Sequence, residues 1–443
     1  MLEALERAVK QTGFDADLLG AFSADELRTM YLRSSEPSEL QSRAALSVAK
    51  PEVPYQLLTE LTQQLRPLLS CYLDPDSDRV GSRLVRLKRE RDSSEPTIAD
   101  LAQALLKPAA TLGSERVVEL LLGWIDGEPL HFRSEALLSG ATVGQPLALT
   151  EAGVRIDPLP ESPADLAASL PPLSAGLYSD RSFYGAFRKG VRLSIDCRLG
   201  PVFYKPSKDE TDRPDFRGTW IHGKIPAPPP FMFCEALSLA CNHCIRWALW
   251  WHDYGGLEQL NAAVGPVMYH DDIPREMATI HLSEEHLKEM LKIYLMRHGS
   301  EAPRPQLDMV IARWMKSKGF LAQRGVLGLA DQFIDLRIAL EALYLGRQYG
   351  GEKGFRLATY GAWHLGADPT ERSKYHKTLR GAYNRASDAV HSGEVKNTPE
   401  VREQLTTAQD LCREGILKRL FEDPEPEWDK LIMGEAEPLM GKS

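Results

Sequence analysis

ADPTERSKYHKTLRGAYNRASDAVHSG, residues 367–393, is the stretch that decides the fold, because it predicts one long helix with both ends marked. Asp368 suits the N-cap, Pro369 the first helical position and Glu371 the back-bonding position of a capping box. Gly393 is placed to end the helix in a left-handed conformation. The apolar stripe consists of Tyr375, Leu379, Tyr383, Ala386 and Val390. The polar line beside it consists of Lys377, Arg380, Asn384, Asp388 and His391.

Segments on both sides of this helix also repeat apolar residues at helical spacing. Residues 331–345 are apolar on two faces, residues 352–365 suggest another helix, and residues 401–421 are amphipathic. Glu341 lies in an apolar row, where a carboxylate needs a cationic or hydrogen-bonding partner, or it protonates. Four or five helices with short connections indicate a helical bundle.

The composition bounds the class of protein. A chain of 443 residues is long enough for several domains, and its net charge of −9 excludes coating of nucleic acid by bulk charge. Any RNA site must therefore be a local basic patch. No apolar run reaches the length needed to span a bilayer, the N-terminus is charged from its third residue, and the six cysteines are irregularly spaced. We expect a cytoplasmic protein with reduced thiols and no membrane contact.

The pattern along the chain predicts a mainly α, multidomain protein. The predicted parts are a helical N-terminal region at 1–110, a mixed α/β region with short strands and Pro-rich loops at 111–230, a helical connector at 231–300, a helical bundle at 301–425 and an acidic tail at 426–443 that packs little. A hairpin is expected to turn at Leu199–Gly200. The basic run at 79–91 favours a solvated helix face, with a phosphate-contacting surface as the alternative.

Three motifs resemble functional sites but have structural explanations. Cys241 and Cys244 form a CxxC pair inside a very apolar segment without a second ligand pair, which favours core cysteines over a zinc site. Arg297–Gly299 end a helical stretch and fit a helix terminus better than a phosphatase motif. Residues 269–272 fit a solvated loop better than a metal site. We predict no metal and no cofactor.

Four segments near the C-terminus occur together in a recognisable order: ALEAL (339–343), the helix that begins ADPTER (367–372), YNRASDAVHSG (383–393) and AQDLCREGILKRLF (408–421). Together they resemble the Apea-like branch of the HEPN superfamily. The resemblance implies a HEPN-type helical bundle that often forms homodimers. Many HEPN domains are metal-independent endoribonucleases with an R-x4–6-H motif, which Arg385 and His391 match.

This residue pair suits RNA cleavage by internal transesterification, in which the 2′-hydroxyl attacks the adjacent phosphorus and the 5′-oxygen leaves. Histidine can shuttle the protons, and arginine can neutralise charge on the phosphorane oxygens. Asn384 and Asp388 lie nearly in line with His391 and could orient the imidazole or bind ribose. The remaining candidates are Glu341 as a supporting residue and Lys377 and Arg380 as RNA contacts.

Arg385 and His391 are six residues apart, about 9 Å along a helix and about 120° around it. One chain's pair cannot easily hold a single phosphate, and the resemblance implies a composite site in a dimer. The arginine position usual in this branch is Ala386 here, and Ser392 precedes Gly393. The alternative is therefore an inactive HEPN module for RNA or nucleotide binding or for dimerisation.

Residues 1–300 match no family by inspection, although such regions commonly precede HEPN domains. We expect this region to sense a trigger protein or ligand and to restrain the C-terminal bundle. The resemblance suggests a role in anti-phage defence or as a toxin.

Overall fold

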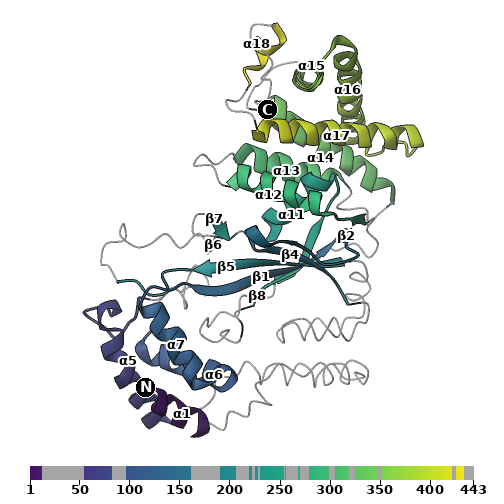
Figure 1. Ribbon diagram of the computed structural model, residues 1–443. Helices are drawn as coiled ribbons and strands as arrows, with labels where there is room; N and C mark the ends of the chain where they lie inside the picture. The colour runs from purple at the N-terminus through teal and green to yellow at the C-terminus, as the bar shows by residue number, and fades with distance from the viewer. Residues whose placement is uncertain are drawn as a thin grey trace. The chain divides into compact units, whose positions relative to one another are not determined.

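The computed structural model describes residues 1–11, 54–81, 96–160, 190–205, 219–221, 225–227, 230–253, 255, 268–269, 279–298, 305–318, 325–346, 352–421 and 426–433. These residues are mostly helical and include a large sheet, so the mainly α prediction is confirmed (Figure 1). The chain divides into two compact units, described separately below. The first unit is Met1–Pro230 with Trp247–Asp271, and the second is Phe231–Arg246 with Asp272–Ser443.

The first unit begins with packed helices. They are α1 (Leu2–Gln11), α5 (Tyr55–Leu68), the 3₁₀ turn η1 (Ser70–Tyr72), α6 (Ile98–Leu112) and α7 (Ser114–Ile125). α6 starts at a capping box, because the Asp100 amide donates to Thr97 Oγ1 (3.1 Å) and the Thr97 amide donates to the Asp100 carboxylate (3.0 Å). Most of the described residues between 1 and 110 are helical, and residues 83–91 of the basic run lie outside the described residues.

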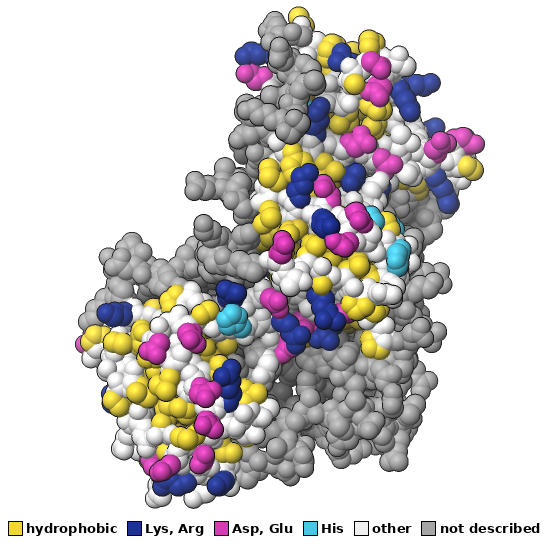
Figure 2. Space-filling model, in the orientation of Figure 1, with side chains coloured by type: hydrophobic (Ala, Val, Ile, Leu, Met, Phe, Trp, Pro, Cys, Tyr) yellow, Lys and Arg dark blue, Asp and Glu magenta, His cyan; other side chains and the backbone are white. Residues whose placement is uncertain are grey.

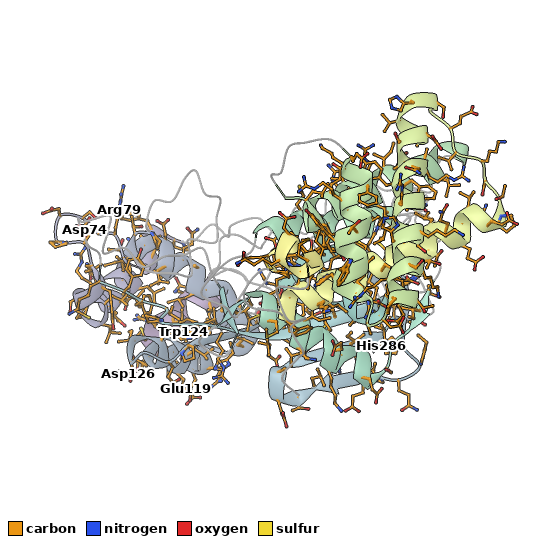
Figure 3. The ribbon with its side chains drawn as sticks, turned by 90° about the horizontal axis from the view of Figure 1, so that it is seen from above. Asp74, Arg79, Glu119, Trp124, Asp126 and His286 are labelled. Carbon is orange, nitrogen blue, oxygen red and sulfur yellow. The ribbon has the colours of Figure 1, made fainter. Side chains whose placement is uncertain are left out.

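A loop after η1 carries the first residue of that basic run. The Asp74 amide donates to the Arg79 carbonyl (2.9 Å), and the two side chains lie together on this loop (Figure 3). Trp124 of α7 is buried, and the Tyr72 hydroxyl donates to the neighbouring Ile125 carbonyl (3.0 Å). Arg79 therefore lies in a loop rather than on the predicted helix face.

The sheet of the first unit has the strand order β3-β4-β5-β1-β8-β9, and β6 and β7 extend from β5. The strands of this sheet are β1 (Leu130–Ser139), β3 (Leu147–Leu149), β4 (Val154–Pro158), β5 (Gly190–Leu199), β6 (Thr219–Ile221), β7 (Ile225–Ala227), β8 (Arg246–Asp253) and β9 (Met268–Tyr269). The short strand β2 (Ala141–Thr142) lies outside this sheet, and the 3₁₀ turn η2 (Thr150–Ala152) precedes β4. The mixed character predicted for 111–230 is confirmed. The predicted hairpin at Leu199–Gly200 is wrong, because β5 pairs with β1, β4 and β6, and the Tyr204 amide donates to the Gly81 carbonyl instead (2.8 Å).

The two faces of this sheet differ in polarity because successive side chains alternate. On one face, Phe132 pairs with Cys197 and Ala136 pairs with Leu193, and all four are buried. On the other face, buried Glu135 forms ion pairs with Arg192 and Arg133, and Arg133 also pairs with Asp253. Burial raises the pKa of Glu135, and the positive charge of Arg192 opposes that rise.

β8 corrects the prediction of a helical connector at 231–300. Its sequence RWALWWHD is a continuous apolar run because β8 lies inside the sheet between β1 and β9. The Trp250 indole donates to Ser134 Oγ (2.9 Å) on one face, whereas Trp251 packs under the Arg192 guanidinium (5.5 Å) on the other. A strand covered on both faces lacks the alternation that distinguishes strands from helices.

The burial of His252 in β8 should make the free energy of unfolding depend on pH. Its ring packs edge-on against Phe132 and Trp250 (both centroids at 5.2 Å), its Nδ1 is sealed from solvent, and burial lowers its pKa to about 4. Because an unfolded histidine titrates near 6.5, the unfolded state binds the proton first, and stability falls as the pH drops from about 6.5 towards 4. We expect a loss of about 2 kcal/mol by pH 5.0, which urea unfolding at pH 7.5 and 5.0 would measure.

His252→Leu removes this titration, so the difference in unfolding free energy between the two pH values should shrink in the variant. An equal loss in both proteins would contradict the assignment to His252.

The second unit is helical. Its elements are α11 (Pro230–Cys241), β10 (Ile280–His281), α12 (Glu284–His298), α13 (Pro305–Ser317), α14 (Gly325–Tyr344), α15 (Lys353–Leu365), α16 (Pro369–Ser392), α17 (Pro399–Phe421) and α18 (Trp428–Met433). α13 packs on α14, and both α14 and α15 pack on α16 (Figure 1). α17 contacts each of the five helices α12, α13, α14, α15 and α16. These helices form one compact unit together with α11 and α12, so this unit starts before the predicted boundary at residue 301.

Small residues allow the bundle helices to approach closely around Tyr344. A Cβ atom at Gly361 would lie 2.5 Å from Leu379 Cδ1, and one at Gly415 would lie 2.4 Å from the Tyr344 hydroxyl. Trp314 is fully buried and donates from its indole to the Gln409 carbonyl (2.9 Å). These contacts fix α14, α15 and α17 around a common core.

The acidic tail was predicted to pack little, and this is wrong for its described part. Trp428 of α18 is buried and stacks on Tyr360 of α15 (5.8 Å between centroids, 12° between planes). The Tyr360 hydroxyl donates to the Asp429 carboxylate (2.7 Å), and Leu431 is also buried. The burial of Trp428 thus holds α18 against the bundle, although the acidic composition of the tail predicted that it would be solvated.

Candidate functional site

α16 has the boundaries that the sequence predicts, Pro369 to Ser392. The Asp368 carboxylate accepts from the amides of Thr370 (2.8 Å) and Glu371 (2.9 Å). The Glu371 carboxylate reaches back to the Ala367 amide (2.8 Å), one residue before the N-cap amide of a regular capping box. Gly393 ends the helix at φ +72°, with its amide donating to the Ala389 carbonyl (2.9 Å).

The buried face of α16 differs in part from the predicted apolar stripe. Leu379 and Ala386 are buried as predicted, but Ala382 and Ala389 complete the buried row. Val390 is 57% exposed, so its assignment to the core is wrong. Small alanines allow α16 to lie close to its neighbours, and a search for large apolar residues overlooks them.

The polar line of α16 faces solvent over its whole length. All five predicted members are exposed, namely Lys377, Arg380, Asn384, Asp388 and His391. On the face of the protein shown in Figure 2, basic and acidic side chains are interspersed, as expected for a chain of net charge −9. The line on α16 is therefore a local feature rather than part of a large basic field.

Arg385 and His391 both reach the surface of α16, but in different settings. His391 is exposed in the last turn of the helix, and Arg385 is half-buried. Arg385 follows Gly381 by one turn, and Gly381 contacts the Gln404 amide of α17, so Arg385 lies on the flank of α16 towards that helix. Within the described part of the chain, neither side chain has a hydrogen-bond or ion-pair partner.

Glu341 does not join this pair. It accepts a hydrogen bond from Arg337 of its own helix (2.7 Å), and both side chains are about one-quarter exposed. The Arg337 guanidinium lies over the Tyr383 ring (4.4 Å), and burial raises the pKa of the Tyr383 hydroxyl, which the nearby Glu341 carboxylate raises further. The carboxylate predicted in an apolar row thus has a cationic partner and joins α14 to α16.

Two basic candidates lie near groups that the sequence did not indicate. Lys377 lines a shallow depression of about 590 Å³ at the beginning of α16, together with Pro369, Thr370, Ser373 and Lys374. The Arg380 guanidinium lies 5.6 Å from the ring centroid of Phe355 on α15. The sequence could have indicated Lys374, because it precedes Lys377 by three residues and therefore lies near it on the same helix. It could not have indicated Phe355, which lies near Arg380 only because α15 packs on α16.

The CxxC pair and the end of α12 lie where the sequence predicts, whereas Tyr269 lies in β9 and pairs with Leu249 rather than lying in a solvated loop. Cys241 and Cys244 are buried, and burial raises the pKa of the Cys241 thiol to about 12. α12 ends at His298, where Arg297 is buried in ion pairs with Glu235 (2.5 Å) and Asp308 (2.8 Å). Among the described residues, no group of three histidine, cysteine or acidic side chains is arranged to hold a metal ion. Residues 270–272 lie outside the described residues.

Comparison with known proteins gives no relative for this chain. It matches no protein-family model, no curated protein and no solved structure. Within the described residues, no helix has both the length and the apolar character that crossing a membrane requires.

Proposed function

We propose that the second unit is a metal-independent endoribonuclease of the HEPN type, with Arg385 and His391 of α16 as its catalytic residues. The observation that carries the proposal is that both side chains are free to contact a substrate. Both reach the surface of one helix, and within the described residues no carboxylate or backbone group holds either side chain. Side chains that need not leave an existing partner can act on a phosphodiester.

In this mechanism His391 takes the proton of the 2′-hydroxyl as that oxygen attacks the neighbouring phosphorus. The bond from phosphorus to the 5′-oxygen then breaks, and a protonated histidine returns a proton to the leaving oxygen. Arg385 donates to the non-bridging phosphate oxygens, where negative charge builds up in the transition state. The products are a 2′,3′-cyclic phosphate and a 5′-hydroxyl, and DNA cannot react because it lacks the attacking group.

A second copy of the chain completes the proposed site. The calculated separation of the pair on a helix, about 9 Å along the axis and about 120° around it, disfavours placing both side chains of one chain on one phosphate. Two α16 helices meeting at a homodimer axis would bring Arg385 of one copy towards His391 of the other. Val390, exposed beside His391, offers an apolar side chain to such a contact.

The same separation favours a second candidate function. If the two α16 helices do not meet, His391 and Arg385 remain apart, and the exposed polar line serves RNA or nucleotide binding without cleavage. This module would bind through Lys377 and Arg380, which have no ion-pair partner within the described residues.

The cellular role follows from the proposed chemistry. All six cysteines are described and are thiols, which favours a reducing compartment such as the cytoplasm. An unrestrained ribonuclease would be toxic, so the first unit is proposed to keep the activity of the second low, without abolishing it, until a trigger protein or ligand binds. Such a device suits anti-phage defence or a toxin.

The test is incubation of the full-length protein with RNA and DNA oligonucleotides of identical sequence in EDTA. We expect cleavage of the RNA and intact DNA, because the attacking hydroxyl is present in RNA alone. Cleavage of both oligonucleotides would contradict the proposed route. Intact RNA at concentrations where the protein is dimeric would favour the binding module.

A further inference from the structure

Phe355, on the first turns of α15, is unusually open for a large aromatic residue. It is 45% exposed, although its ring contacts two side chains of α16. The His376 ring lies against it at 5.4 Å between centroids and 72° between planes, and the Arg380 guanidinium lies 5.6 Å from its centroid. Its position is set by Gly354, where a Cβ atom would lie 2.7 Å from Tyr383, so α15 can approach α16 closely.

The groups around Phe355 make this surface cationic. Burial lowers the pKa of His376, and Arg380 lowers it further, so the imidazole is neutral at pH 7. The positive charge comes from Arg380 beside the ring and from Lys377 and Lys374, about one and two turns earlier on α16, which line one depression. Within the described residues, these three cations have no carboxylate at ion-pair distance. An open aromatic ring beside the cation Arg380, with two further cations earlier on the same helix, fits a ligand that has both flat bases and phosphates.

The position of this surface on α16 relates it to the proposed catalytic residue. Arg380 and His391 are eleven residues apart, which places them about 16 Å apart along the axis and within about 20° of the same direction. Asn384 and Asp388 lie between them on the exposed line. A single strand that follows α16 would therefore pass both the ring and His391.

We propose that Phe355, framed by His376 and Arg380, is a stacking platform for one base of single-stranded RNA, with the adjoining phosphates on Lys374 and Lys377. This inference rests on the proposed function for the identity of the ligand. Duplex RNA is excluded from the platform because its bases are stacked inside the helix. The platform selects unpaired RNA and positions the strand along α16 towards His391.

The test uses the full-length His391→Ala protein, which keeps the RNA intact during measurement, and a fluorescein-labelled single-stranded RNA in EDTA at fixed salt. Adding Phe355→Ala should weaken binding roughly tenfold, the usual scale for loss of one aromatic stack. Phe355→Trp should keep the affinity, because indole also stacks. Arg380→Ala should weaken binding and reduce its salt dependence.

Phe421→Ala is the matched control, because Phe421 of α17 is 36% exposed and also lies beside a cation, with Lys292 Nζ 4.6 Å from its ring centroid. It lies on another helix, far from the α16 line in sequence, so its loss should leave affinity unchanged. Equal affinities for the Phe355→Ala and Phe421→Ala proteins would overturn the platform, as would the absence of measurable RNA binding by any variant.

Cleavage by proteins that retain His391 separates this inference from the proposed function. His391-dependent cleavage together with unchanged binding by Phe355→Ala would overturn the platform and leave the nuclease standing. Phe355-dependent binding without any cleavage would support the platform and contradict the nuclease.

Discussion

His391→Ala should abolish RNA cleavage, lowering the rate by about 100- to 10,000-fold, the range over which a positioned acid–base group acts. Arg385→Ala should cause a loss of similar size, because charge on the phosphorane oxygens would lose its neutralising donor. Initial rates on a labelled RNA in EDTA, at equal dimer concentrations, would measure both effects.

These losses should occur without loss of folding. Within the described residues His391 holds no partner, so its replacement should change the free energy of unfolding by less than about 0.5 kcal/mol. His131→Ala is the matched control, since His131 is also an exposed histidine but lies on β1 of the other unit. Arg385→Lys separates charge from geometry, because lysine keeps the charge and loses the planar fork. A His391→Ala protein as active as the control would contradict the role of His391.

Trp428→Ala should cost about 3–5 kcal/mol of unfolding free energy in the second unit, the usual range for truncating a buried tryptophan. Besides stacking on Tyr360, its ring meets Tyr344 and His364 edge-on, each at 5.3 Å. Removing it would leave these aromatic faces against a cavity, or against water if α18 undocks. Urea unfolding, followed by the far-ultraviolet circular dichroism of the helices rather than by tryptophan fluorescence, would measure the change.

Met433→Ala provides the comparison within the same helix, because Met433 is 71% exposed and should change stability by less than about 0.5 kcal/mol. Equal effects of the two substitutions would contradict the role of Trp428 in docking α18 to the bundle.

Local rules predicted α16 accurately because its ends are determined by neighbouring residues. The carboxylate of Asp368, the ring of Pro369 and the positive φ of Gly393 act within a few residues of the helix termini. The sequence failed for β8 and α18, whose conformations depend on distant partners. β8 is covered by residues more than a hundred positions earlier, such as Ser134, and Trp428 finds its aromatic partners on α14 and α15.

The candidate site was predictable to the extent that it lies on one helix. Periodicity placed His391 and the other members of the polar line on the exposed face of α16. It could not find Phe355, because that ring reaches Arg380 only after α15 packs on α16. Nor could it tell that Glu341 pairs with Arg337 rather than with Arg385.

Analysis of the ends of RNA cleaved in EDTA tests the central claim most directly. Wild-type protein and the His391→Ala variant would be incubated with the same end-labelled RNA at equal concentrations. We expect 2′,3′-cyclic phosphate and 5′-hydroxyl ends from the wild type and intact RNA from the variant. Products with 5′-phosphate ends, or equal cleavage by both proteins, would contradict this claim.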